Sequence, residues 1–322
     1  MSIKGDYRGR GDTNLPSLPE EKTLMRVSWA DKHAFRILLG PALLVLILLS
    51  IIPFIHVIYI SFHTWELTKP WLGRPFIGLD NFRAFVHSAQ VWESLRITVI
   101  FTVMSVGISM IIGFLLALLL NQQFRGQTIF RSLFLIPMMI TPVVIGLSWR
   151  FMLDPTFGVL NYLLSLIGVP AQAWLTDPRL VLPTIVAVDV WQWIPLIMLI
   201  VLAGLQAMPQ APFEAAQMDG ASDWMIFRRI TLPFLRPVIL IALLLRTMDA
   251  IRTFDTTYIM TGGGPGSMTE LASIHLYRKG LKYFHIGDAS AYALVVLATI
   301  MLASFLYIKI IEREAGDDEK GC

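Results

Sequence analysis

Apolar residues recur in six long runs along this chain, separated by shorter polar segments. A helix that crosses the hydrocarbon core of a bilayer needs about 20 mainly apolar residues. The six runs reach that length, at roughly 37–62, 97–120, 129–152, 181–203, 237–256 and 289–311. The pattern predicts an all-α fold, a polytopic membrane bundle of six transmembrane helices.

Composition agrees with a membrane protein. Hydrophobic residues make up 55% of the 322 positions and charged residues 15%, with a mean hydropathy of +0.64, which lies outside the range of soluble globular domains. The polar residues 1–35 precede a first run that is too long for a cleaved signal peptide. We therefore expect a cytoplasmic arm at 1–35, a transmembrane domain at 36–311 and a cytoplasmic tail at 312–322.

The distribution of Lys and Arg predicts the orientation. Cytoplasmic loops of membrane proteins are enriched in these residues. With the N-terminus inside, fifteen of the 26 fall on the inner side and eight on the outer side, and the remaining three, Arg150, Arg246 and Arg252, lie within the spans. Both termini should face the cytoplasm, in a multi-pass protein of the cytoplasmic (inner) membrane. The basic residues form no stripe, so no nucleic-acid partner is expected.

The predicted inner loop at about 204–236 contains two helical segments. Pro212 suits the first turn of a helix and Glu214 complements its dipole, after which Gly220 should break the helix and Ser222 should cap a second one. Apolar residues here, Trp224 among them, indicate that another protein packs on the loop. An interfacial helix lying on lipid is the alternative.

Ionisable residues also occur inside the predicted spans. Each costs about 2.5–3.5 kcal/mol at a helix centre, so they should face protein or water. Asp189 belongs to the fourth span, and the fifth holds Arg246, Asp249, Arg252 and Asp255. Spacings of three permit pairing within the helix, and Arg252 could pair with Asp189 or Asp249. These residues either line a wet translocation path or fasten helices together.

Two tryptophans beside Asp189 add a candidate solute site. Trp191 and Trp193 flank Gln192, and aromatic faces beside amide and carboxylate groups suit the stacking and hydroxyl hydrogen bonds of a sugar. An interfacial tryptophan belt is the competing explanation. The predicted substrate path is Asp189, Trp191, Gln192, Trp193, Asp249 and Arg252.

Catalytic and metal-binding motifs are absent from the sequence. The only cysteine, Cys322, is the last residue, and no H-E-x-x-H or G-x-S-x-G occurs. The glycine run 262–266 is followed by no Gly-Lys-Ser/Thr, so it is not a phosphate-binding loop. We predict no catalytic site, no metal, no bound cofactor and no ATPase activity of the chain itself.

The inner loop resembles a specific family signature. The pattern E-A-A, three residues, Gly, nine residues, Ile, any residue, Leu-Pro is that of ABC-importer permease subunits, and every position is filled: Glu214, Ala215, Ala216, Gly220, Ile230, Leu232 and Pro233, with Ala221 beside the glycine. Further segments resemble the sugar-permease branch, among them Trp191–Pro195, Gly78–Phe82 and Thr261–Pro265.

The resemblance implies that this loop couples the permease to a cytoplasmic ABC ATPase dimer, which binds the ATP. It also implies a second permease subunit, an extracytoplasmic solute-binding protein and a sugar or polyol as solute. The alternatives are an ion-coupled secondary transporter, which would need broken helices in matching halves, and a membrane enzyme, for which the sequence offers no nucleophile or metal set.

Overall fold

The computed structural model describes residues 39–122 and 125–320, with side chains as far as Lys309. The predicted arm at 1–35 and Cys322 lie outside these residues. Two units are distinguished, residues 1–54 and 55–322, and the contacts below belong to the second. The elements in chain order are η1 (Ile47–Ile51), α2 (Ile52–Ser61), η2 (Pro70–Leu72), α3 (Asp80–His87), α4 (Ala89–Asn121), α5 (Gln127–Met139), α6 (Pro142–Met152), α7 (Val159–Leu166), α8 (Val181–Gln206), α9 (Ala211–Met218), α10 (Asp223–Ile226), η3 (Phe227–Thr231), α11 (Leu232–Arg252), α12 (Asp255–Thr261), α13 (Ala272–Tyr277), η4 (Arg278–Lys282) and α14 (Ile286–Lys320).

The predicted spans are present, with one of them broken. Within the described residues, five helices are long and apolar enough to cross a membrane, and the bent pair α5 and α6 makes a sixth candidate. The pair bends by 95°. Thr141 is extended, at ψ 142°, a conformation that the following proline favours, and Pro142 then begins α6. The described helices thus match the predicted all-α bundle.

Both predicted boundaries of the fifth span are wrong. The fifth span was expected at 237–256, but one continuous helix runs from Asp223 to Arg252. Thr253 is extended, at ψ 126°, and α12 begins at Asp255. Asp255 therefore lies beyond the span, on the next helix. The last helix, α14, runs to Lys320, and the candidate span within it ends at Lys309, close to the predicted end of the sixth span at 311.

The core is built around the packing of α4 on α8. A Cβ added at Gly113 would lie 2.7 Å from the Cβ of Ile197, so the absence of a side chain lets the two helices approach closely. One buried apolar cluster includes Phe101 and Ile185, and a second includes Ala117 and Ile197. Both helices thus contribute to two apolar layers, and on α4 the buried serines Ser105 and Ser109 lie between these layers in sequence.

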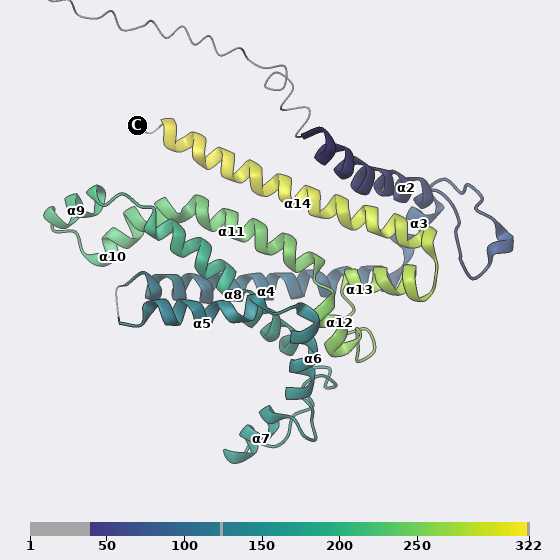
Figure 1. The fold of residues 1–322 in the computed structure, drawn as a ribbon, viewed down its shortest axis with the longest axis horizontal. Coiled ribbons are helices and arrows are strands. Elements are labelled where there is room, and N and C mark those ends of the chain that lie inside the picture. Colours follow the sequence, from purple (N-terminus) through teal and green to yellow (C-terminus); the bar gives the residue numbers. More distant parts are fainter. Residues whose placement is uncertain (1–38, 123–124, 321–322) are drawn as a thin grey trace, which may run out of the picture. The chain divides into compact units, whose positions relative to one another are not determined.

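Figure 1 shows how the short elements are distributed around the long helices. Helices α9 and α10 lie at one end of α8 and α11, whereas α6, α12 and α13 lie at the opposite end. The predicted coupling loop and the ends of the broken helices therefore occupy opposite ends of the bundle.

Candidate solute cavity and coupling loop

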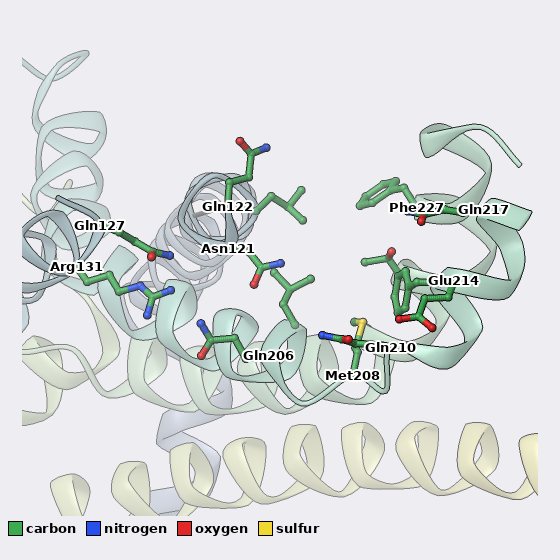
Figure 2. Close-up of a pocket in the computed structure, with 14 residues that line it drawn as sticks. Asn121, Gln122, Gln127, Arg131, Gln206, Met208, Gln210, Glu214, Gln217 and Phe227 are labelled. Carbon is green, nitrogen blue, oxygen red and sulfur yellow. The ribbon is translucent and has the colours of Figure 1, made fainter. Parts of the chain in front are cut away.

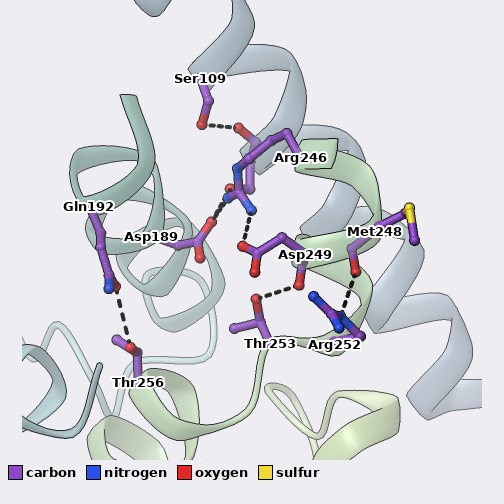
Figure 3. Close-up of polar contacts among 10 residues, drawn as sticks. Ser109, Asp189, Gln192, Arg246, Met248, Asp249, Arg252, Thr253 and Thr256 are labelled. Atoms are coloured by element: carbon purple, nitrogen blue, oxygen red, sulfur yellow. Dashed lines mark hydrogen bonds and ion pairs between the residues drawn. The ribbon is translucent and has the colours of Figure 1, made fainter. Parts of the chain in front are cut away.

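Arg246 is the centre of a buried ion cluster that joins three helices (Figure 3). Its side chain is 0% exposed. The guanidinium donates to the carboxylate of Asp189 on α8 and, over 2.6 Å, to the hydroxyl of Ser105 on α4. It also donates over 3.1 Å to Asp249, one turn away on α11. Ser105 in turn donates to Asp189.

The spacing of three correctly indicated a pair within α11, that of Arg246 with Asp249, but the suggested pairing of Arg252 with either carboxylate is not among the described ion pairs. The ion pairs are made by Arg246, whereas the Nε of Arg252 donates over 3.2 Å to the backbone oxygen of Met248. Arg252 is the last residue of α11 and is exposed, so its side chain does not point between the helices as that of Arg246 does. Ser105 and Ser109, one turn apart within an apolar span, could have indicated the polar face of α4.

A cavity of about 250 Å³ adjoins this cluster. It is lined by Pro142, Asp189, Gln192, Trp193, Asp249, Arg252, Thr253, Phe254, Asp255 and Thr256. Five of the six predicted path residues are therefore brought together. Trp191 is not among the lining residues: its ring packs edge-on against Trp149, with centroids 5.4 Å apart.

Two helix breaks meet at this cavity. The α5–α6 break ends at Pro142 and the α11–α12 break contains Thr253 and Phe254, and all three residues line the cavity. The hydroxyl of Thr256 donates over 3.2 Å to the backbone oxygen of Pro142 and so connects the two breaks. Irregular backbone at membrane depth is tolerated only where it is buried in protein or lines a water-filled cavity. The breaks also bring polar backbone and Thr, Gln and Asp side chains to one place, which suits hydrogen bonding to a hydroxylated solute.

The coupling loop has the predicted turn. Helix α9 ends at Met218 and Gly220 has φ +73°, with open space around it. The amide of Ala221 donates over 2.9 Å to the oxygen of Ala216, the bond expected where a left-handed glycine closes a helix. The hydroxyl of Ser222 accepts from the amide of Met225 over 3.4 Å. The second helix is longer than expected, because α10 and η3 continue into α11 without a break.

The loop exposes apolar side chains beside its acidic ones. Met218 is 83% exposed and Trp224 69% exposed. The ring of Trp224 stacks on that of Phe227, with centroids 5.6 Å apart, so the indole is held in place. Glu214 and Ala215 are exposed on α9. Exposed apolar surface of this kind marks a site of interaction.

A second cavity, which the sequence did not predict, lies beside α9. It measures about 900 Å³ and is lined in part by Glu214, Gln217, Gln127 and Arg131. In Figure 2 the two α9 residues lie on the side opposite Gln127 and Arg131, which belong to α5. Gln127 and Arg131 donate to the backbone oxygen of Leu120 over 2.5 and 3.0 Å. They thus provide hydrogen-bond donors for a carbonyl in the last turn of α4.

A titratable cluster orders the segment between α12 and α14. Glu270 accepts a 2.7 Å hydrogen bond from the ring of His275 and pairs with Arg278, which also donates over 2.5 Å to the oxygen of Gly262. The hydrogen bond from His275, followed by the charge of Arg278, holds the pKa of Glu270 below its usual value. The cluster therefore carries an ionised carboxylate at neutral pH.

Comparison with known proteins decides the family. Residues 109–314 match the family described as binding-protein-dependent transport system inner membrane component. The chain belongs to this family. It is the membrane-spanning permease subunit of an ABC importer, a multi-pass protein of the inner membrane whose ATPase is a separate subunit. The prediction of an importer permease is confirmed, and these matches give no support to the ion-coupled alternative.

Two relatives match this permease over most of its length. The trehalose/maltose transport system permease protein MalF of Thermococcus litoralis is 36% identical, over 93% of the chain and 98% of the relative. The sulfoquinovosyl glycerol transport system permease protein SmoG of Agrobacterium fabrum is 34% identical, over 91% and 96%. A chain in the crystal structure of a bacterial alginate ABC transporter, in complex with an alginate pentasaccharide-bound periplasmic protein, shares the fold. Its TM-score is 0.77 at 23% identity, over 89% of this chain and 98% of that one.

Proposed function

We propose that this permease forms half of the translocation path for a sugar or polyol and that the cavity at the two helix breaks is its solute site. The observation that carries the proposal is the convergence of Asp189, Gln192, Trp193, Asp249 and Arg252 on one cavity. Its volume of about 250 Å³ falls just below the ~300–1,000 Å³ of typical ligand pockets. That size suits one wall of a site that a second permease subunit completes. The names of the relatives, which include carriers of trehalose, maltose and a sulfoquinovosyl glycoside, support a sugar.

We test the solute site with neighbouring tryptophans. Trp193 lines the cavity, whereas Trp191 packs on Trp149. Trp193→Ala should raise the KM for sugar uptake by the whole transporter by about tenfold, equivalent to ~1.4 kcal/mol of binding, because a stacking face is lost. Trp191→Ala is the matched control and should leave KM within about twofold. Equal effects of the two substitutions, at equal membrane levels, would contradict the assignment.

The second part of the proposal concerns coupling to the ATPase. Helix α9 and the turn at Gly220 would enter a cleft of the cytoplasmic ATPase, with Glu214, Ala215 and Ala216 on the helix that docks and Trp224 on the next helix. The partners are an ATPase dimer, a second permease and an extracytoplasmic solute-binding protein, and both termini lie in the cytoplasm. The adjacent alanines permit close approach, and Glu214 can accept a charge-assisted hydrogen bond worth about 1.5–3 kcal/mol.

Two substitutions test the coupling. Glu214→Lys reverses the charge, and Gly220→Asp places a side chain at φ +73°, where strain costs about 1–3 kcal/mol. Both should lower ATPase copurification and transport together while the permease inserts at normal levels. Gly73→Asp is the matched control, because Gly73 has φ +66° and also faces open space, but lies in the segment between α2 and α3. The coupling role of the loop would be refuted if Gly73→Asp also lowered ATPase copurification. It would equally be refuted if both loop variants kept wild-type ATPase copurification and transport.

A further inference from the structure

We propose that the solute cavity admits uncharged or cationic sugars and discriminates against anionic ones. This inference rests on the proposed function, because it names the solute class of the same cavity. Its basis is the charge of the cavity wall. Three carboxylates line the cavity, those of Asp189, Asp249 and Asp255, and Arg252 is the only guanidinium among the lining residues.

The second nearby cation, Arg246, does not offer its charge to a solute. Its side chain is 0% exposed and contacts the carboxylates of both Asp189 and Asp249. Even when Arg246 is counted with the wall, three carboxylates face two guanidinium groups, which leaves one net negative charge. A solute meets this charge directly, because Asp255 is exposed and the side chain of Asp249 is 29% exposed.

The helix ends at the cavity do not offset this charge. A helix presents about half a positive charge at its N-terminus and half a negative charge at its C-terminus. At the first break the C-terminus of α5 meets the N-terminus of α6, and at the second the C-terminus of α11 meets the N-terminus of α12. Each positive end therefore stands beside a negative one, and the side chains decide the sign.

Arg252 is the obvious site at which an anion could bind, but two carboxylates lie near it in the cavity wall. Asp249 and Asp255 stand three positions before and after it, and all three residues line the cavity. A sulfonate or carboxylate bound to Arg252 would therefore lie close to two carboxylates of the same wall. Of the solute chemistries named for the two relatives, the wall suits an uncharged disaccharide better than a sulfonated glycoside.

Charged thiol reagents measure the sign of the cavity without any assumption about the solute. Thr253 lines the cavity, and Thr253→Cys in a Cys322→Ser background gives one thiol there. Cationic (trimethylammonium) and anionic (sulfonate) methanethiosulfonates react by the same step, in which the thiolate forms a mixed disulfide and methanesulfinate leaves. The measured quantity is the ratio of the reaction rate with the cationic reagent to that with the anionic reagent. This ratio should be at least about tenfold higher for Thr253→Cys than for the control Ser165→Cys. Ser165 is an exposed residue of α7 with no Asp, Glu, Lys, Arg or His from 155 to 176.

Two further substitutions in the thiol background have opposite expected effects. Asp255→Asn removes a negative charge and should lower the cation preference, whereas Arg252→Gln removes a positive charge and should raise it. A general disturbance of the cavity would shift both ratios in the same direction. An unchanged ratio in both variants, or a preference for the anionic reagent in the parent, would overturn the inference.

Uptake by the whole transporter separates this inference from the proposed function. We expect uptake of an uncharged disaccharide, with trehalose and maltose as probes, and at least about tenfold weaker uptake of sulfoquinovosyl glycerol. Efficient uptake of the sulfonated probe would refute the charge selection and leave the sugar path intact. If Thr253→Cys reacts with neither reagent, the cavity is not wet, and both the selection and the solute path fail.

Discussion

Replacing Arg246 by methionine would leave the carboxylate of Asp189 buried without its main partner. The Asp189 side chain is 4% exposed, and its remaining donor among the described contacts is the hydroxyl of Ser105. Breaking a buried ion pair from one side costs about 3–5 kcal/mol. That is a large part of the ~5–15 kcal/mol by which a typical protein is stable, so Arg246→Met should lower the melting temperature and the amount of inserted protein.

Removing both partners should restore much of this loss. Exchange of a buried ion pair for apolar residues of similar volume is often neutral or stabilising by about 1–4 kcal/mol. The double variant Arg246→Met with Asp189→Leu should therefore unfold close to the wild-type temperature. Arg150→Met is a control for the loss of an arginine, because Arg150 is exposed and makes one 3.1 Å bond to the oxygen of Ile259.

The assay is thermal unfolding of the purified transporter in detergent, followed by uptake in proteoliposomes. A double-mutant cycle gives the coupling energy between Arg246 and Asp189, expected at about 3–5 kcal/mol. A value near the ~0.6 kcal/mol typical of neutral bonds between membrane helices would refute the argument. Uptake by the double variant also shows whether Asp189 only fastens helices or lines the translocation path. If stability and transport both recover, Asp189 only fastens helices. If stability recovers without transport, Asp189 belongs to the path.

Three shorter predictions follow. Gly113→Ala should destabilise by about 1–3 kcal/mol in thermal unfolding, because the added Cβ would overlap the facing isoleucine of α8; Gly107→Ala, on the same helix with open space around it, should be neutral or stabilising. Glu270→Gln should lower the melting temperature at neutral pH. Since the folded pKa of this carboxyl is depressed, its contribution to stability is complete above the unfolded pKa near ~4.3 and disappears as the pH falls through the folded pKa. A difference in melting temperature between variant and wild type that does not change with pH would contradict this prediction. For topology, a cysteine at Gly78 should react with an impermeant reagent added outside and one at Gly220 should not; the reverse pattern would invert the orientation.

The local elements of this protein could be predicted from the sequence. The spans follow from runs of apolar residues, because backbone polar groups in lipid can be satisfied only within a helix or a closed barrel. The turn at Gly220 follows from the preference of glycine for positive φ, and the cap at Ser222 from the side-chain oxygen that a helix start requires. Each of these features depends on residues that are near one another in the chain.

The tertiary structure decided which residues meet across helices. The long helices are apolar on nearly all faces, so their periodicity does not tell which face is buried. For that reason the sequence could not distinguish Trp193, which lines the cavity, from Trp191, which packs on α6. Nor could it place Arg246 between α4 and α8, because the bonds to Ser105 and Asp189 join residues 141 and 57 positions away. The two helix breaks come together for the same reason, since only packing brings Pro142 to Thr256.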